Sequence, residues 1–283
     1  MKFGCHISAA GGVANCPERA NRVGAEVFQF FSRSPQGGSA PKLTKTVVAD
    51  FQTGLKKYRQ QAYIHAPYYI NFASANPRTK HGSVSVIKQE LARGSLLGAS
   101  ALMTHLGSSK DVGEISGIKM VIAGLIEVLR GYQGNCRFLI ENSAGSGQII
   151  GDTFEEIAAI IKGVEKAVGK NKIGVCLDTA HAFASGYDLR TLADVGKMLK
   201  NFDQIIGLSR LVLIHGNYSK VDLCSHKDRH EHIGLGKIGL AAFKALISSK
   251  KLDKVNLIIE TPEDEIRTDA KNLAVLKKLR ANV

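Results

Sequence analysis

Residues 173–188, IGVCLDTAHAFASGYD, combine a short apolar run with a carboxylate at its end and a histidine three positions later. The apolar residues favour a buried parallel strand, so Asp178 is expected at the strand's end and His181 on the turn beyond it. A carboxylate and an imidazole at this spacing can face one cation. The spacing alone is a weak indication, because Asp also caps helices and His often lies hydrogen-bonded in a core.

Similar apolar runs recur along the whole chain. Eight runs are present, at residues 2–5, 26–31, 62–64, 101–104, 137–140, 173–177, 211–214 and 255–259. Helical spacing lies between them, for example at 83–97 and 115–129, and Thr153 with Glu156 fits a capping box. Eight units in 283 residues give the size of a parallel βα repeat. With no linker or break in composition, residues 1–283 are predicted to form a single-domain (β/α)8 TIM barrel.

Composition narrows the class of protein. Hydrophobic residues make up 44% and charged residues 22% of the chain, and no segment reaches the ~20 apolar residues needed to span a bilayer. The first residues lack the apolar core of a signal peptide, so a cytoplasmic, intracellular protein is expected. The five cysteines are scattered and form no Cys-x-x-Cys pair, which argues against a disulfide framework or a zinc ribbon.

The chain is strongly basic, with 38 Lys and Arg against 25 Asp and Glu, a formal charge of +13. Such a surplus favours a polyanionic partner, nucleic acid first and an acidic membrane second. Charge alone is a weak argument, because many basic proteins carry only solvated lysine-rich faces.

A parallel barrel brings the ends of its strands to one face. The eight runs are followed by His6, Phe31, His65, His105, Glu141, Asp178, His215 and Glu260. Loops add His181, Asp228 and His230. Apart from His6 and Phe31, these residues are nine candidate ligands of imidazole and carboxylate type, which suit zinc, manganese or iron. At about three protein ligands for each catalytic zinc, the set fits three ions.

Clustered metal ions are suited to catalysing phosphodiester hydrolysis, because they activate a water molecule and neutralise the phosphate oxygens. Together with the basic composition, they favour a nuclease. A sugar isomerase or epimerase with a single metal is the alternative in the same architecture, and the surplus of histidines argues against it. A DNA-binding barrel that has lost catalysis is a third possibility.

Six collinear motifs carry a family resemblance. They are GCHISAAGG at 4–12, IENSAGSG at 140–147, GVCLDTAHAFASGYDLR at 174–190, IHGNYSK at 214–220, DRHEHIGLGKIG at 228–239 and IIETP at 258–262. With these motifs the chain resembles endonuclease IV, the zinc-dependent apurinic/apyrimidinic (AP) endonuclease family of DNA base excision repair.

The resemblance implies a site of three zinc ions. The implied ligand sets are His65 and His105 with bridging Glu141, then Asp178, His215 and Glu260 with Glu141, and finally His181, Asp228 and His230. Glu141 and Glu260 are implied to be catalytic as well. The family cuts double-stranded DNA 5′ to an abasic sugar, leaving a 3′-hydroxyl and a 5′ deoxyribose phosphate, and trims blocked 3′ ends. A monomer is implied.

The chain also departs from the family pattern. In the motif HxNDSK the Asp is replaced by Tyr218, and Gly216 stands in place of an aliphatic residue. Tyr218 is expected to adjust the site without removing a metal, either through changed loop packing or through a contact beside the metal ligands. The loop after the second strand, FFSRSPQGGSAP, lacks the family's Arg-aromatic ending.

Several residues are candidates for contacts around the site. Tyr68 and Tyr69 match the family's DNA wedge, although ordinary rim packing is an equal alternative. Arg33 and Gln36 could reach the minor groove, and Lys237 could contact a phosphate. His6 is expected beside the ligands, hydrogen-bonded to one of them or to phosphate. The remaining histidines are expected to be exposed in loops, namely His81, His226 and His232.

Overall fold

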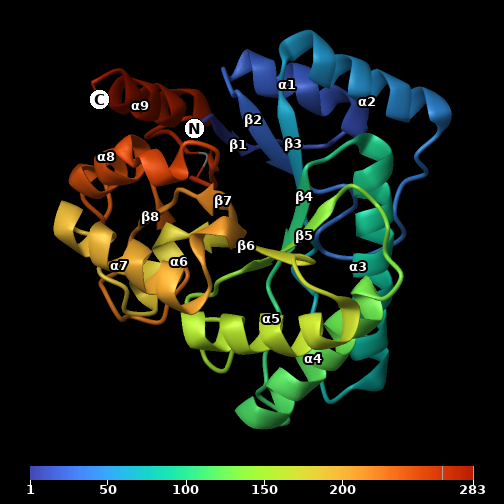
Figure 1. The fold of residues 1–283 in the computed structure, drawn as a ribbon. Helices are drawn as coiled ribbons and strands as arrows, with labels where there is room; N and C mark the ends of the chain where they lie inside the picture. The colour runs from blue at the N-terminus through green and yellow to red at the C-terminus, as the bar shows by residue number, and fades with distance from the viewer. Residues whose placement is uncertain (263, 283) are drawn as a thin grey trace.

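The computed structural model describes residues 1–262 and 264–282, and its strands close into a parallel barrel (Figure 1). The barrel strands of this part of the chain are β1 (Phe3–His6), β2 (Val27–Phe30), β3 (Gln61–His65), β4 (Ala101–Thr104), β5 (Arg137–Glu141), β6 (Ile173–Asp178), β7 (Leu211–His215) and β10 (Asn256–Ile259). Their order around the barrel is β1-β10-β7-β6-β5-β4-β3-β2. The predicted (β/α)8 barrel is therefore confirmed.

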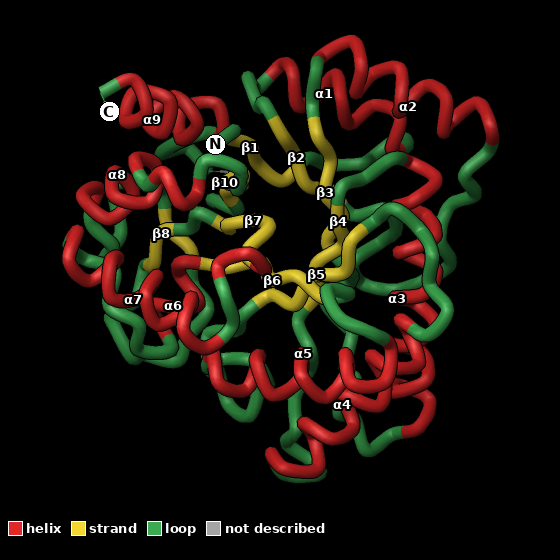
Figure 2. The backbone as a smooth tube through the Cα atoms, in the orientation of Figure 1, coloured by secondary structure: helices red, strands yellow, loops and turns green. Residues whose placement is uncertain are grey.

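Helices form a ring outside the strands, as Figure 2 shows in red around yellow. They are α1 (Cys16–Arg22), α2 (Lys45–Tyr58), α3 (Pro77–Leu97), α4 (Glu114–Leu129), α5 (Phe154–Val168), α6 (Thr179–Ala184), α7 (Leu192–Ile205), α8 (Leu240–Ser248) and α9 (Asp269–Ala281). Short 3-10 turns lie at Val13–Asn15, Leu208–Arg210 and Lys250–Leu252. A small antiparallel pair, β8 (Tyr218–Ser219) and β9 (His230–Glu231), lies beyond β7.

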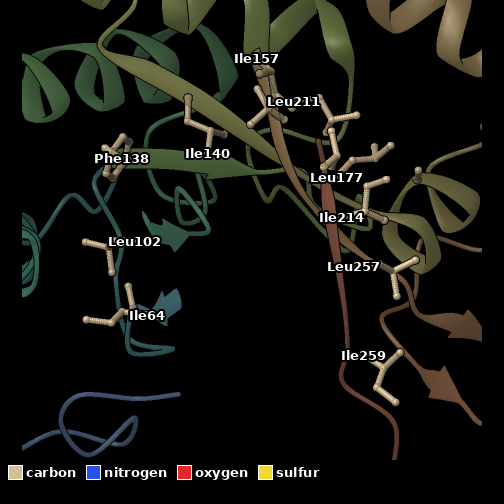
Figure 3. Packing of buried hydrophobic residues seen from close by; sticks show 14 of the residues in the cluster. Ile64, Leu102, Phe138, Ile140, Ile157, Leu177, Leu211, Ile214, Leu257 and Ile259 are labelled. Atoms are coloured by element: carbon tan, nitrogen blue, oxygen red, sulfur yellow. The ribbon is translucent and has the colours of Figure 1, made fainter. Parts of the chain in front are cut away.

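The alternation of side chains along each strand creates two hydrophobic layers. In β2, Val27 belongs to the cluster inside the barrel, whereas Phe28 and Phe30 belong to the larger cluster between strands and helices. Figure 3 shows the larger cluster, where residues such as Ile64 and Leu102 pack outside the strands. The inner cluster contains Val27, Tyr63, Ala101, Met103, Leu139, Cys176, Leu213 and Ile258. It fills the barrel below its mouth, and the polar side chains described below gather above it.

The predicted helix start at Thr153 is confirmed with one difference. The Thr153 hydroxyl accepts a hydrogen bond from the backbone N–H of Glu156 at 3.2 Å, as a capping residue does. The Glu156 carboxylate accepts from the N–H of Gly151 at 2.7 Å, and not from Thr153. The carboxylate therefore secures the loop before the helix.

None of the helices in residues 1–262 and 264–282 is both long and apolar enough to cross a membrane.

Candidate metal centre

Polar side chains from every barrel strand converge at the mouth. In chain order they are His6, Gln29, His65, His105, Glu141, Asp178, His215 and Glu260. The first helical turn of α6 adds His181, and the segment around β9 adds Asp228 and His230. The nine predicted ligands are thus brought together in one cluster.

Glu141 lies at the centre of the first group. One of its oxygens, Oε2, is 3.0 Å from Nε2 of His65 and 3.7 Å from Nε2 of His105. The side chains of these three residues each offer an atom within 4.8 Å of the others. Two imidazoles and a carboxylate at this separation can share one metal ion.

The second group shares Glu141 with the first. Nδ1 of His215 is 2.9 Å from Glu141 Oε1, 3.3 Å from Glu260 Oε2 and 3.9 Å from Asp178 Oδ2. These four residues offer atoms within 4.8 Å of one another. Because the two oxygens of Glu141 face different groups, this carboxylate has the geometry of a bridge.

The third group lies around His181 and His230. Asp228 Oδ1 is 3.2 Å from Nε2 of His181 and 3.3 Å from Nε2 of His230. Asp178 also belongs to this group, with Oδ2 3.7 Å from Nε2 of His230. The Asp228 side chain is 54% exposed, so this group opens to solvent.

Backbone carbonyls fix the orientation of three imidazoles. Nδ1 of His65 donates to Ala66 O at 2.6 Å, because a carbonyl oxygen can only accept. In the same way, Nδ1 of His181 donates to Asn142 O at 3.0 Å, and Nδ1 of His230 donates to Glu260 O at 3.0 Å. Each ring therefore turns Nε2 toward the carboxylates. His215 is reversed, since its Nε2 bonds Gln29 and its Nδ1 faces the carboxylates.

The donor set fits metal ions. Among the described residues, the buried nitrogens Nε2 of His181 and Nε2 of His230, which both face the carboxylates, make no hydrogen bond of good geometry. A buried nitrogen without a hydrogen bond is costly, and ligation removes that cost. Imidazole nitrogen and carboxylate oxygen without a thiolate are the donors of a catalytic zinc, manganese or iron site.

The pKa shifts at the mouth indicate that the clustered carboxylates favour positive charge beside them. Burial opposes ionisation, but Asp178 and Asp228 raise the pKa of His181 to about 10. Burial would also raise the pKa of Glu260, yet His215 outweighs it and lowers the pKa to about 2. Burial dominates at His6 and lowers its pKa to about 4. In the metal-free cluster, protons therefore stabilise the carboxylates that a metal ion would otherwise neutralise.

Two asparagines hold the ligands, and we did not predict a role for either from the sequence. Asn142 Oδ1 accepts from the N–H of Asp178 at 2.7 Å, and its Nδ2 donates to the Asp178 carbonyl at 3.1 Å. Asn217 Nδ2 donates to Asp178 Oδ2 at 2.6 Å and to Glu260 Oε2 at 3.2 Å. Their position in the sequence could have indicated this role, because each asparagine lies within two residues of a candidate ligand inside one of the motifs given above.

Gln29 was also missed. We took Phe31, after the second apolar run, as the residue at the mouth, but Phe31 packs edge-on against His65 and Tyr68 at centroid distances of 5.6 and 5.2 Å. The signal for Gln29 was the alternation in VFQF, where an amide shares a face with Val27. His6 Nδ1 contacts Gln29 Nε2 at 3.1 Å, and the same Nε2 donates to Glu260 Oε1 at 2.7 Å, so His6 reaches the candidate ligands through Gln29, and its bond to phosphate stays a prediction.

Of the two alternatives predicted for Tyr218, the structure shows the packing role and, in the part of the chain that it describes, no contact with the metal ligands. The ring of Tyr218 is fully buried and lies 4.5 Å from the ring of Phe243. Its hydroxyl has no hydrogen-bond partner among the described residues. Tyr218 therefore belongs to the packing between the β8–β9 pair and α8. Gly216 has a packing reason too, because a Cβ there would lie 2.5 Å from the Leu257 side chain.

Four of the five residues predicted to contact DNA are exposed or partly exposed, and the fifth, Arg33, is buried. Tyr68 is 71% and Tyr69 37% exposed, and Tyr68 lies beside the centre through its contact with His65. Gln36 is exposed on the loop after β2. Lys237 is exposed, with Nζ 3.3 Å from Asp222 Oδ1. Of these four residues, Tyr68 is the one whose contact with His65 places it beside the centre.

Arg33 contradicts its prediction. Its side chain is only 4% exposed, and Nε lies 2.7 Å from Oε1 of Glu90, which is fully buried. Nη2 donates to Gln89 Oε1 at 2.9 Å. Arg33 is therefore held against α3 and does not reach outward. It fixes the loop after β2 onto that helix.

The remaining histidines were predicted to be exposed in loops. His226 is exposed outside any helix or strand, as expected, and His81 is exposed within α3. The prediction for His232 is wrong, because its side chain is fully buried. Nε2 of His232 lies 2.9 Å from Asp264 Oδ1, and Nδ1 lies 3.0 Å from Asn272 Nδ2. It ties the segment after β9 to α9.

A cavity of about 810 Å³ adjoins the cluster. It lies between the loop after β1, which includes Ser8, and the loop after β2, which includes Ser34. Tyr68 and Glu260 line it on the side of the centre. Among the nine candidate ligands, Glu260 therefore borders a space large enough for a small ligand.

Comparison with known proteins agrees with this geometry. The family described as "Xylose isomerase-like TIM barrel" matches residues 17–279. A protein of Methanoculleus marisnigri named "Probable endonuclease 4" is 37% identical over 98% of both chains. One of Aquifex aeolicus with the same name is 37% identical, covering 99% of this chain and 98% of its own.

Solved structures give the same result. Endonuclease IV from Thermus thermophilus superimposes with a TM-score of 0.88 at 31% identity, with full coverage of both chains. A D-tagatose 3-epimerase-like protein has a TM-score of 0.72 at 18% identity, covering 100% of this chain and 98% of its own. At that identity the second likeness concerns the fold alone.

Proposed function

Because the chain belongs to the endonuclease IV family of xylose isomerase-like TIM barrels, we propose that it is a DNA repair nuclease acting at abasic sites. It hydrolyses the phosphodiester 5′ to the abasic sugar in double-stranded DNA, leaving a 3′-hydroxyl and a 5′ deoxyribose phosphate, and it trims blocked 3′ ends. The convergence of nine imidazole and carboxylate side chains at the barrel mouth carries this proposal.

We assign the ligands to three zinc ions. His65, His105 and Glu141 hold the first, and Glu141 also contributes to the second. The other ligands of the second ion are Asp178, His215 and Glu260, and those of the third are His181, Asp228 and His230. When bound, such ions lower the pKa of a water and neutralise the phosphate that is attacked.

The protein's own residues position these groups. Asn217 holds the Oδ2 atom of Asp178 and the Oε2 atom of Glu260, so both carboxylates keep one orientation. Glu141 contributes one carboxylate oxygen to the first ligand group and the other oxygen to the second. We propose that Glu141 and Glu260 are catalytic. The buried and hydrogen-bonded surroundings keep the ligands from rearranging between turnovers.

The surroundings of the mouth support a DNA substrate. Tyr68 and Tyr69 are exposed aromatic side chains beside the centre and can stack on bases next to the lesion. The formal charge of +13 favours the phosphate backbone, and Gln36 and Lys237 are exposed side chains that we propose for further DNA contacts. The chain is proposed to act as a monomer.

The test is incision of a labelled duplex that carries one abasic site. Zinc-loaded protein should cut the strand once, 5′ to the lesion, and a polymerase should extend the product from its 3′-hydroxyl. Chelated protein, a Glu260→Gln variant and an intact duplex serve as controls and should give no product. Zinc-loaded protein that binds the abasic duplex without cutting it would favour the barrel with lost catalysis. A single metal per chain with sugar epimerisation would favour the alternative enzyme class.

A further inference from the structure

Gln29 makes three hydrogen bonds at the centre of the barrel mouth and is fully buried. Its Nε2 atom is 2.7 Å from Oε1 of Glu260 and 3.1 Å from Nδ1 of His6. Its Oε1 atom is 2.7 Å from Nε2 of His215. One amide thus joins β2 to β1, β7 and β10, and two of its three partners are proposed metal ligands.

The partners determine which way the amide faces. A carboxylate can only accept, so the amide atom beside Glu260 must be the NH2 group. The amide oxygen then faces His215, whose Nε2 must carry the proton and donate it. In a neutral imidazole this leaves the lone pair on Nδ1 of His215.

That lone pair points into a space bounded by carboxylate oxygens. Nδ1 of His215 lies 2.9 Å from Glu141 Oε1 and 3.3 Å from Glu260 Oε2. A lone pair and carboxylate oxygens repel one another unless a cation lies between them. The other imidazoles that bond a carbonyl present Nε2, so His215 is the exception, and Gln29 is the residue that makes it so.

We propose that Gln29 is a positioning residue of the second metal subsite: it holds His215 in the tautomer that ligates through Nδ1 and fixes Glu260 so that Oε2 faces the ion. The inference rests on the proposed metal centre. Gln29 acts here as outer hydrogen-bonding groups do in other metal sites, where they set the tautomer and orientation of a ligating histidine.

The test is the zinc affinity of purified protein, measured by competition with a chromogenic chelator. Gln29→Met keeps the length of the side chain and removes its hydrogen bonds. We expect one zinc equivalent to bind about 10–100-fold more weakly, with the other equivalents unchanged. Gln29→Glu keeps an acceptor for His215 but sets a second carboxylate against Glu260, so it should also weaken the binding of that zinc equivalent.

A matched control removes an amide at the other end of the barrel. Asn256 is buried in β10 and bonds the Tyr63 hydroxyl at 2.8 Å, away from the mouth. Asn256→Leu should leave the affinity of every zinc equivalent unchanged, even if the melting temperature falls. Equal loss of zinc in Asn256→Leu and Gln29→Met would reduce Gln29 to a packing residue and overturn the inference.

A measurement on the unmutated protein keeps the inference testable if Gln29→Met does not fold. Long-range ¹H–¹⁵N NMR of histidine-labelled, zinc-loaded protein distinguishes metal-bound from protonated ring nitrogens. One zinc-bound imidazole with Nδ1 on the metal and Nε2 protonated, lost in His215→Ala, is expected. Ligation of His215 through Nε2, or wild-type zinc affinity in Gln29→Met, would refute the role of Gln29 alone. Wild-type protein that binds no zinc would refute the proposed metal centre as well.

Discussion

Asp178 caps the helix that carries His181: its Oδ1 atom accepts a hydrogen bond from the backbone N–H of His181 at 2.8 Å. The other oxygen, Oδ2, faces the proposed metal centre, 3.9 Å from His215 Nδ1. The carboxylate of Asp178 therefore caps the N-terminus of α6 with one oxygen and faces the proposed metal centre with the other. The helix register fixes His181 relative to Asp178, so the two groups to which these residues belong are coupled through the backbone.

Insertion of one alanine between Thr179 and Ala180 should break this coupling. The inserted residue moves His181 around the helix by about 100° and removes it from the cap. Ligands of two proposed ions are then displaced, so zinc content measured by atomic emission should fall by more than one ion per chain. The matched control is an alanine inserted after Gly38, on an exposed loop, which should keep the wild-type content. Loss of a single ion would contradict the coupling.

Zinc uptake should release protons. Burial and the neighbouring carboxylates leave the pKa of His181 at about 10 in the metal-free protein, so its ring is charged at neutral pH. Zinc must displace that proton to reach Nε2. Titration calorimetry at about pH 7.5 in buffers of different ionisation enthalpy should detect at least one proton released per chain. A binding enthalpy that is the same in all buffers would argue against this.

The same group predicts how the stability of metal-free protein depends on pH. The folded pKa of His181, about 10, is above its ordinary value of 6.5, so its contribution is complete below about pH 6.5 and is lost as the pH rises through about 10. The melting temperature of chelated protein should therefore fall across this window. Zinc-loaded protein should show a smaller fall, because the metal takes the place of the proton. Parallel profiles with and without zinc would contradict the explanation.

The fold and the convergence of the nine candidate ligands could be predicted from the sequence, because both depend on local patterns. Short apolar runs mark the strands, and in a parallel barrel the residue at each run's end lies at the mouth. Gln29 was missed because we took the residue at the end of the run, Phe31, as the one at the mouth. The side chain that reaches the mouth is on the inward face of the strand, which Gln29 shares with Val27.

The residues that were placed wrongly depend on distant partners. Arg33 is basic and lies in a loop, and only the fold shows that Glu90, 57 residues away, is buried against it. His232 is buried by Asn272, 40 residues further along the chain. Pairings across such separations leave no periodic trace in the sequence, so composition and loop position suggested exposure instead.

Tyr68 should contribute to DNA binding and little to stability. Stacking of an aromatic ring on a base is worth about 1–3 kcal/mol, so Tyr68→Ala should weaken binding to an abasic duplex by roughly 5- to 150-fold. Because the residue is 71% exposed, the free energy of unfolding should change by less than about 0.5 kcal/mol. Tyr58→Ala, at the end of α2, is the control and should not change DNA affinity in a fluorescence anisotropy titration. Unchanged affinity in Tyr68→Ala would leave Tyr68 as ordinary rim packing.

Arg33 should behave as a structural residue and not as a phosphate contact. Glu90 would keep the hydrogen bond from Ser32 and a longer contact with Arg93 at 3.5 Å, so Arg33→Met should lower the free energy of unfolding by less than the about 3–5 kcal/mol that an unpaired buried charge costs. The slope of log affinity for DNA against log salt concentration should stay at its wild-type value, since no phosphate contact is lost.

The contrasting variant is Lys237→Met. Lys237 is exposed, and its pair with Asp222 is on the surface, so stability should change by less than about 1 kcal/mol. If Lys237 neutralises one phosphate, the salt slope should fall by about one. Urea unfolding and anisotropy titrations at several salt concentrations separate the two effects. A reduced salt slope in Arg33→Met, with stability intact, would mean that Arg33 leaves Glu90 to reach the DNA, and the loop after β2 would then have to rearrange on binding.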